Sequence, residues 1–277
     1  MIRKIKFFLH SIYVIFSLPR ISGRNYKTVK LDYNDTSWKI IANKIRQTLA
    51  ADPEIEIMSL LSSSFIEPNT NLAVMSKIRI TNPTNYLLYK ASKLEELFPD
   101  KKLNVLELGT GFGWNLSVLR SSGHTGVLTG VDISEVAISL ARDISSRYQL
   151  NISYSVIDIT KTTQIINQFI PDDFDVIFSY QVFEQLPLDT TQLIESLVEL
   201  FPCKQFIFIE SSAKLPPKNL SDLLSKIYVW KKNYQVTLFK TLKNLEASNK
   251  IKDFGVERLR CSHKIGNESA VYKFRSV

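Results

Sequence analysis

The stretch Leu103-Asn-Val-Leu-Glu-Leu-Gly-Thr-Gly-Phe-Gly-Trp-Asn-Leu116 decides the fold of this chain. Apolar side chains in its first half predict a short buried strand, and apolar residues at helical spacing after it predict that a helix begins there. Between the two elements, glycines stand at three alternate positions: Gly109, Gly111 and Gly113. Glycines in this place permit a sharp turn and the close approach of a ligand, which side chains would block. The stretch therefore predicts a strand, a tight turn and a helix N-terminus that together bind a nucleotide-like ligand.

The spacing of the glycines separates this loop from two other nucleotide-binding loops. A dinucleotide fingerprint requires G-x-G-x-x-G, and a Walker loop requires Gly-Lys-Ser/Thr, neither of which is present in the stretch. Here Glu107 stands two residues before the first glycine, which gives the pattern E-x-G-x-G-x-G. In this pattern the sequence resembles the class I S-adenosylmethionine-dependent methyltransferases, whose first motif has this form. The alternative is a glycine-rich turn in another doubly wound fold.

Strand and helix patterns alternate five times along the chain, which predicts a parallel sheet with its ligand at the carboxyl ends of the strands. The resemblance, which covers about residues 100–277, implies an α/β fold. Its sheet is Rossmann-like, seven-stranded and doubly wound, the last strand is antiparallel, and a helical extension precedes it. We expect an N-terminal, mainly helical extension over residues 1–95 and a methyltransferase domain over 96–277 with a helical insertion at 214–250.

The individual elements follow from apolar spacing and from Pro or Gly at their ends. Strands are predicted over residues 125–131, 152–157, 176–179 and 205–210, and an antiparallel pair over 256–261 and 270–274. Helices are predicted over residues 37–50, 85–98 and 135–148, another ends at 200, and a long basic helical stretch runs over 219–247 as an acceptor-side insertion or lid.

Acidic residues stand at the ends of the second and third predicted strands. Asp132 lies where a carboxylate accepts both ribose hydroxyls of an adenosine, although it could instead cap the next helix. The resemblance implies that Asp158 meets the adenine amino group with Ile159 near the ring; the alternative for Asp158 is a helix cap. By the same resemblance, Glu107 orients the methionine end of the cofactor through its ammonium group. The predicted cofactor-binding residues are Glu107, Gly109, Thr110, Gly111, Gly113, Asp132, Ile133, Asp158, Ile159 and Ser179.

The segment 174–187 resembles the fourth strand of the family and the turn after it. Where the family often has Glu-His-Leu-Pro, this chain has Glu-Gln-Leu-Pro, and the glutamine, Gln185, cannot take up a proton as a neutral imidazole does. A general base is useful when the acceptor is a hydroxyl. Because Gln185 cannot serve as that base, another residue must do so. The predicted catalytic residues are Glu184, Tyr180 and His263, with Glu210 as a further candidate. His124 is expected at the surface.

Composition limits the class of protein. A hydrophobic content of 44% and a charged content of 22% are those of a soluble globular chain. The two cysteines, Cys203 and Cys261, lack metal-type spacing, which indicates neither a disulfide framework nor a metal site and favours the reducing cytoplasm. The net charge of +8 is uneven, because residues 1–30 carry seven basic and no acidic residues whereas 31–213 carry 14 basic and 22 acidic ones. Residues 214–264 are again basic, with 12 basic and four acidic residues, and both basic flanks are expected to meet an anionic partner.

The first twenty residues place basic side chains before an apolar run from Phe7 to Leu18. This run is too short to span a bilayer as a helix. Two interpretations remain: an interfacial helix that makes peripheral membrane contact, or a helix that packs on the domain.

The resemblance implies the function and the cofactor together. We expect methyl transfer from S-adenosylmethionine to an O or N atom of a small molecule, sugar or lipid-linked glycan. One alternative is a non-catalytic adenosine-cofactor-binding pseudo-enzyme that serves as a partner subunit. RNA methylation is another, although the chain shows no recognisable RNA-binding module, so a nucleic acid partner is not expected.

Overall fold

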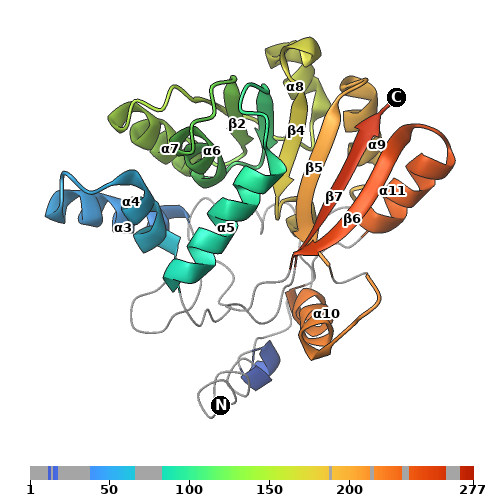
Figure 1. Ribbon diagram of the computed structural model, residues 1–277, viewed down its shortest axis with the longest axis horizontal. Helices are drawn as coiled ribbons and strands as arrows, with labels where there is room; N and C mark the ends of the chain where they lie inside the picture. Colours follow the sequence, from blue (N-terminus) through green and yellow to red (C-terminus); the bar gives the residue numbers. More distant parts are fainter. Residues whose placement is uncertain are drawn as a thin grey trace.

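A computed structural model of the chain describes residues 12–13, 15–17, 38–65, 83–186, 189–212, 215–232, 237–259 and 269–277. A seven-stranded sheet runs through the molecule in the order β3-β2-β1-β4-β5-β7-β6 (Figure 1). The strands are β1 (Val105–Leu108), β2 (Leu128–Asp132), β3 (Ser153–Val156), β4 (Val176–Tyr180), β5 (Gln205–Ser211), β6 (Ile251–Leu259) and β7 (Ser269–Ser276). Strands β1 to β5 are parallel, and β7 lies antiparallel between β5 and β6. The predicted α/β sheet with an antiparallel last strand is confirmed.

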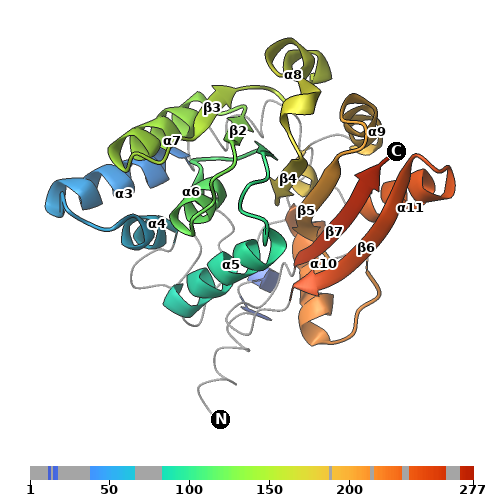
Figure 2. The ribbon, with the colours of Figure 1, turned by 45° about the horizontal axis from the view of Figure 1, so that its top comes forward.

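Helices cover both faces of this sheet, as Figure 2 also shows. On the first face lie α3 (Trp38–Ala51), α4 (Ile57–Phe65), α5 (Pro83–Leu97), α6 (Trp114–Ser121) and α7 (Glu135–Arg147). On the second face lie α8 (Thr162–Gln168), α9 (Thr191–Leu200) and α11 (Leu238–Ala247). Short 3-10 turns, η2 (Pro171–Asp173) and η3 (Phe183–Gln185), flank β4, and α10 (Leu220–Lys232) follows β5.

The alternation of side chains along the central strands divides the core into two layers. In β1, Val105 packs in the cluster of the first face, whereas Leu106 and Leu108 pack in the cluster of the second face. Because successive side chains of a strand point to opposite faces, Glu107 points to the first face, toward α5 and α6. Leu108 pairs with Val131 and with Ser179, so the loops after β1, β2 and β4 lie together at the carboxyl ends of the strands.

The stretch 219–247, expected to be helical, forms two helices, α10 and α11, and α11 packs its apolar side chains on the second face of the sheet. The expectation that His124 lies at the surface is wrong. His124 is buried, because its ring fills the junction before β1 and its Nε2 lies 2.7 Å from the carbonyl oxygen of Leu103. Burial lowers the pKa of His124.

The N-terminal segment is described only at residues 12–13 and 15–17, where Ile15 is buried and Tyr13 and Phe16 are exposed. The rest of the apolar run that was considered for the membrane lies outside the described residues. Among the helices that are described, none is both long and apolar enough to cross a bilayer.

Candidate active site

The glycine loop after β1 makes the predicted sharp turn. Gly109, Gly111 and Gly113 have φ values of +69°, +57° and +79°, all in the left-handed region that favours glycine. Gly113 is the N-cap of α6, and its N–H donates to the carbonyl oxygen of Thr110 at 3.0 Å. The strand, turn and helix N-terminus that the sequence predicts are therefore present.

Side chains of the protein itself occupy the space beside each glycine. A Cβ on Gly111 would lie 2.5 Å from the indole of Trp38, which comes from α3. A Cβ on Gly109 would collide with Val182, and one on Gly113 with the hydroxyl of Tyr154. The three glycines thus allow close packing within the chain, a reason for their presence that the sequence does not reveal.

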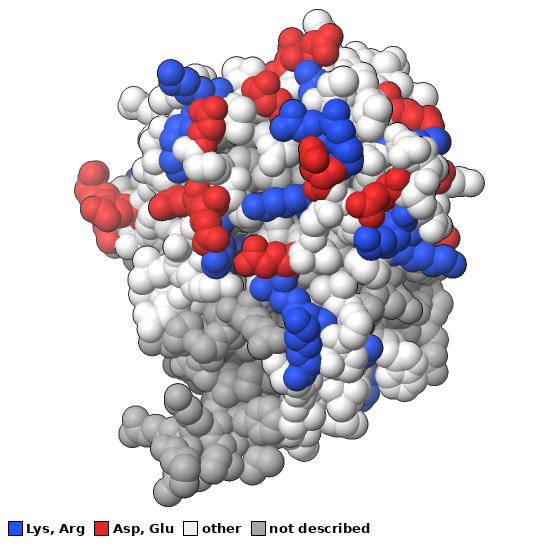
Figure 3. Space-filling model, turned by 45° about the vertical axis from the view of Figure 1, so that its right-hand side comes forward, with Lys and Arg blue, Asp and Glu red and all other residues white. Residues whose placement is uncertain are grey.

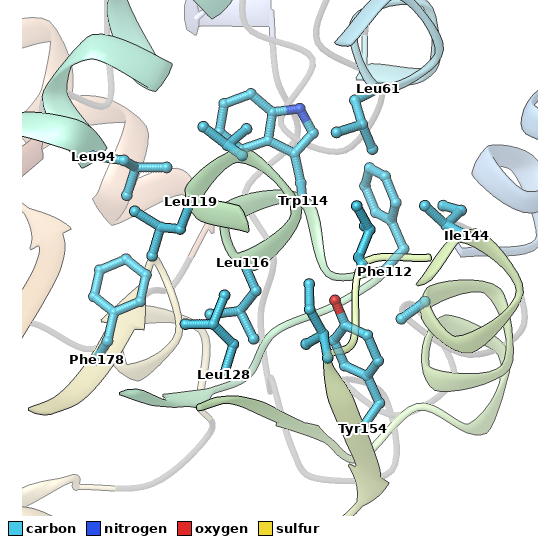
Figure 4. Packing of buried hydrophobic residues seen from close by; sticks show 14 of the residues in the cluster. Leu61, Leu94, Phe112, Trp114, Leu116, Leu119, Leu128, Ile144, Tyr154 and Phe178 are labelled. Atoms are coloured by element: carbon cyan, nitrogen blue, oxygen red, sulfur yellow. The ribbon is translucent and has the colours of Figure 1, made fainter. Parts of the chain in front are cut away.

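The residue between two of the glycines, Phe112, anchors the loop to the N-terminal helices. Its ring makes an edge contact with Trp38 at a centroid distance of 5.8 Å. Figure 4 shows Phe112 beside Leu61 of α4, and the ring of Tyr154 rising from β3 toward the loop. The N-terminal helices α3 and α4 therefore pack directly on the glycine loop.

Glu107 lies fully buried beneath the loop. Its carboxylate accepts hydrogen bonds from the Thr110 hydroxyl at 2.6 Å and from the Asn115 amide at 2.5 Å. Burial raises the pKa of Glu107 to about 7, against the lowering effect of these two hydrogen bonds and of the charge of Lys90. The loop therefore covers an acidic group that a cationic ligand would hold in its charged form.

Asp132, at the end of β2, is tied to the same loop. One carboxylate oxygen accepts from the backbone N–H of Gly111 at 2.9 Å, and the other accepts from the N–H of Ser134 at 2.8 Å. Burial raises the pKa of Asp132. Ser134, not Asp132, caps α7 with its side chain, because its hydroxyl accepts from the N–H of Ala137 at 3.2 Å. Ile133 is half-buried between them.

Lys90, on α5, was not among the residues predicted from the sequence. It is buried, and its ammonium nitrogen lies 4.1 Å from the ring centroid of Trp114 and 4.1 Å from that of Tyr180. A buried cation between two aromatic rings is stabilised by their electron-rich faces. A single lysine in an amphipathic helix carries no signal of this role, because only the packing of α5 against α6 and β4 places it beside Glu107.

The predicted residues of β4 separate to the two faces of the sheet. Tyr180 packs against the cluster of the first face, near Lys90. Ser179 points to the second face, where its hydroxyl donates to Glu210 at 3.1 Å. The side chains of Ser179 and Tyr180 therefore lie on opposite faces of the sheet, and the Ser179 hydroxyl is hydrogen-bonded to Glu210.

Glu210 holds the turn after β4 in place. Its carboxylate accepts from the backbone N–H of Val182 at 2.9 Å and of Glu184 at 3.3 Å. Glu184 is buried beside it, and both burial and this second carboxyl group raise the pKa of Glu210. The residue that opens the turn, Gln181, has a φ of +56°, a left-handed conformation that is uncommon for a side chain other than glycine.

Asp158 follows β3 and makes local hydrogen bonds. One of its oxygens accepts from the backbone N–H of Thr160 at 3.1 Å and from the Thr160 hydroxyl at 2.6 Å. Ile159 is buried in the cluster of the second face. His263 lies outside the described residues, and within those that are described no group of His, Cys, Asp and Glu side chains has the arrangement of a metal site.

Comparison with known proteins places this fold in a family. Residues 99–264, more than half of the chain, match the family described as "Methyltransferase domain". A ubiquinone biosynthesis O-methyltransferase from Coxiella burnetii is 29% identical over 126 residues, which are 46% of this chain and 48% of the relative. The chain thus spans about half the length of the curated relatives it matches.

Solved structures share the fold. Magnesium protoporphyrin IX methyltransferase from Synechocystis, solved with bound SAH, has a TM-score of 0.55 at 11% identity over 91% of this chain and 99% of that one. An O-methyltransferase from Bacillus cereus in complex with SAH has a TM-score of 0.50 at 15% identity over 88% of this chain and 98% of that one. The family match, the sheet order and the E-x-G-x-G-x-G loop after β1 together show that the chain belongs to the class I S-adenosylmethionine-dependent methyltransferases.

Proposed function

We propose that this protein transfers the methyl group of S-adenosylmethionine to an oxygen or nitrogen atom of a small molecule, a sugar or a lipid-linked glycan. The observation that carries the proposal is the glycine loop, with buried Glu107 beneath it and Asp132 bound to the N–H of Gly111 at 2.9 Å. The curated relative from Coxiella burnetii and the structure from Bacillus cereus are both named O-methyltransferases, which supports transfer to oxygen. The cofactor supplies a methyl group on a sulfonium, which is already activated for transfer.

The residues around the loop fit the two ends of this cofactor. Asp132 lies at the end of β2, where its carboxylate would accept the ribose hydroxyls. Glu107 would attract the ammonium of the methionine portion, because a carboxylate in a buried site gains most from a cationic partner. Asp158 and Ile159 remain our proposal for the adenine end, and the local hydrogen bonds of Asp158 would have to adjust to it.

Lys90 would bind the carboxylate of the methionine portion. Its ammonium nitrogen lies beside Trp114, the first residue of α6, and a helix N-terminus also favours an anion. Lys90 and Glu107 would thus hold the two opposite charges of one amino acid group. The presence of a buried lysine and a buried glutamate side by side supports binding of the amino acid portion of the cofactor next to α5.

Methyl transfer mainly requires that the acceptor atom be held in line with the methyl group, a positioning effect that contributes up to about 7 to 11 kcal/mol. Tyr180 is half-buried at the carboxyl end of β4, and we assign it to contact with the acceptor. Glu184 and Glu210 lie buried together, so a proton bound to one of them avoids two adjacent negative charges. Glu184 is our candidate for receiving a hydroxyl proton, and Glu210 positions the turn that carries it.

Binding calorimetry with S-adenosylmethionine tests the proposal. We expect binding by the native chain and an affinity lowered about 10- to 100-fold in Asp132→Asn, since an ionic hydrogen bond contributes about 1.5–3 kcal/mol. Asp143→Asn, which removes the same charge from an exposed site on α7, is the matched control. Equal affinities in the two variants would contradict the assignment of Asp132.

Formation of S-adenosylhomocysteine with fractionated cell extracts then measures turnover. We expect product with a small-molecule, glycan or lipid fraction. Binding of the cofactor without product in any fraction would instead support the non-catalytic alternative.

A further inference from the structure

Helix α10 carries an apolar stripe on its outer surface. Leu220, Leu223 and Trp230 are exposed by 48%, 46% and 55%, and their spacing of three and seven residues places them on one side of the helix. The other side of α10 packs inward through buried Leu224 and Tyr228. The helix therefore has one apolar face in the protein and a second one in solvent.

The described part of the N-terminal segment extends this stripe. Tyr13 and Phe16 are exposed by 69% and 55%. The ammonium of Lys231 donates to the carbonyl oxygen of Phe16 and lies 5.9 Å from its ring centroid. Figures 1 and 2 both show residues 12–13 and 15–17 beside α10. We call these pieces together, residues 12–13, residues 15–17 and α10, the α10 surface.

The charges on this surface have one sign. Lys226, Lys231 and Lys232 lie on α10, and the acidic residue of the helix, Asp222, is buried and pairs with Arg258 at 3.2 Å. In Figure 3, Lys and Arg gather on the lower part of the visible face, where no acidic side chain is seen among the described residues. Exposed leucine and aromatic side chains next to lysines have the composition of helices that lie at a membrane interface.

The position of the α10 surface connects it with the site. Helix α10 follows the carboxyl end of β5, and the loops that hold Glu107, Asp132 and Tyr180 follow the carboxyl ends of parallel strands of the same sheet. A flat partner that covers the α10 surface would therefore lie at the same end of the sheet as these loops.

We infer that the α10 surface docks onto a lipid bilayer that contains anionic phospholipid. The exposed apolar side chains enter the interface, and the lysines meet the phosphate-bearing headgroups. A bilayer accounts for these features together, because it offers an apolar layer under a continuous negative surface. The inference rests on the surface alone and holds whichever acceptor the protein methylates.

Sedimentation with vesicles tests the inference on the full chain. We expect it to sediment with phosphatidylcholine vesicles that contain phosphatidylglycerol, to sediment less with pure phosphatidylcholine, and to be released by salt. The triple variant Lys226→Gln, Lys231→Gln, Lys232→Gln should bind about fivefold more weakly for each lysine removed. Failure of the native chain to bind anionic vesicles would overturn the inference.

Tryptophan fluorescence identifies the surface that makes the contact. Trp38 and Trp114 are buried and Trp230 is exposed, so brominated lipids should quench Trp230 selectively. The double variant Leu220→Gln, Leu223→Gln should weaken vesicle binding. The control Val127→Gln changes an exposed apolar residue at the amino end of β2, away from α10, and should not weaken it. Equal losses in both variants would overturn the assignment of the surface.

Two further readouts separate the possible outcomes. Cofactor affinity should remain unchanged in all of these variants, which shows that they are folded and keeps this test apart from that of the proposed function. Light scattering could reveal a dimer that is lost in Leu220→Gln, Leu223→Gln. Such a dimer, together with no vesicle binding, would show that the partner of the α10 surface is a second copy of the chain and not a bilayer.

Discussion

Glu107 links cofactor binding to pH. In the free protein its pKa is raised to about 7, mainly by burial, so that the carboxyl group is protonated below this value. A cationic ammonium favours the charged form. We therefore expect the affinity for S-adenosylmethionine to rise with pH up to about 7 and then to level off, with a slope of at most about tenfold per pH unit below it.

Calorimetry between pH 5.5 and 8.5, roughly centred on that pKa, measures this dependence. Proton release on binding appears as a dependence of the measured heat on the ionisation enthalpy of the buffer. Glu107→Gln should bind more weakly and lose the slope that is due to this residue, while keeping any slope due to the ammonium of the ligand. An unchanged slope in the variant would show that Glu107 does not take part.

Replacing Lys90 tests whether this residue binds the amino acid end of the cofactor and not the adenosine end. Replacement by methionine keeps the length of the side chain and removes the charge between Trp114 and Tyr180. We expect Lys90→Met to lower the affinity for S-adenosylhomocysteine about 10- to 100-fold, in line with about 1.5–3 kcal/mol for a charged hydrogen bond. Binding of 5′-methylthioadenosine, which lacks the carboxylate, should not change.

The control for this substitution lies on the same helix. Lys93→Met removes a lysine that pairs with Glu96 on a more exposed side of α5, and it should leave both affinities unchanged. Equal weakening of both ligands by Lys90→Met would indicate a structural role for the lysine and contradict the assignment.

At the scale of the element, the turn between β1 and α6 depends on packing as well as on backbone conformation. Gly113 and Gly123 both have positive φ values, +79° and +86°, but a Cβ meets Tyr154 only at Gly113 and meets nothing within 4 Å at Gly123. Alanine in a left-handed conformation costs about 1–2 kcal/mol, and overpacking adds about 1–3 kcal/mol. We expect Gly113→Ala to lower the free energy of unfolding by the sum of the two, and Gly123→Ala by the first alone.

Urea unfolding of the two variants measures the difference. The background Tyr154→Phe, which removes the hydroxyl nearest to the added Cβ, should recover part of the loss in Gly113→Ala and none in Gly123→Ala. Equal losses for the two glycines would show that backbone conformation alone requires Gly113.

At the scale of the whole molecule, the N-terminal helices and the sheet share one hydrophobic cluster. Ile41 and Ile45 of α3 and Leu60 of α4 belong to the same cluster as Phe112 and Phe178. Trp38 of α3 fills the space beside Gly111. We therefore propose that α3, α4 and α5 complete the core of the methyltransferase domain, although they lie before or across the expected boundary near residue 95. Removing α3 and α4 would expose the apolar side chains of α5 and Phe112 of the glycine loop.

Much of this architecture follows from local patterns. The buried strands, the glycine turn, the carboxylate at the end of β2 and the Ser134 cap are fixed by neighbours in the sequence, because apolar periodicity and turn chemistry act over a few residues. The predicted strands 125–131 and 152–157 agree with β2 and β3 to within a few residues. The apolar spacing over 219–247 predicts helical structure but does not indicate where α10 ends and α11 begins.

The sequence by itself determined the fold class, the family and the cofactor loop, because a strand, a glycine turn and a helix must be adjacent in the chain. Only the tertiary structure decided that Lys90 lies between Trp114 and Tyr180, that Trp38 closes the space beside Gly111, and that α10 turns an apolar stripe to solvent. These features depend on contacts between segments far apart in the chain. Spacing in the sequence does not encode such contacts, because they form only when the helices pack against the sheet.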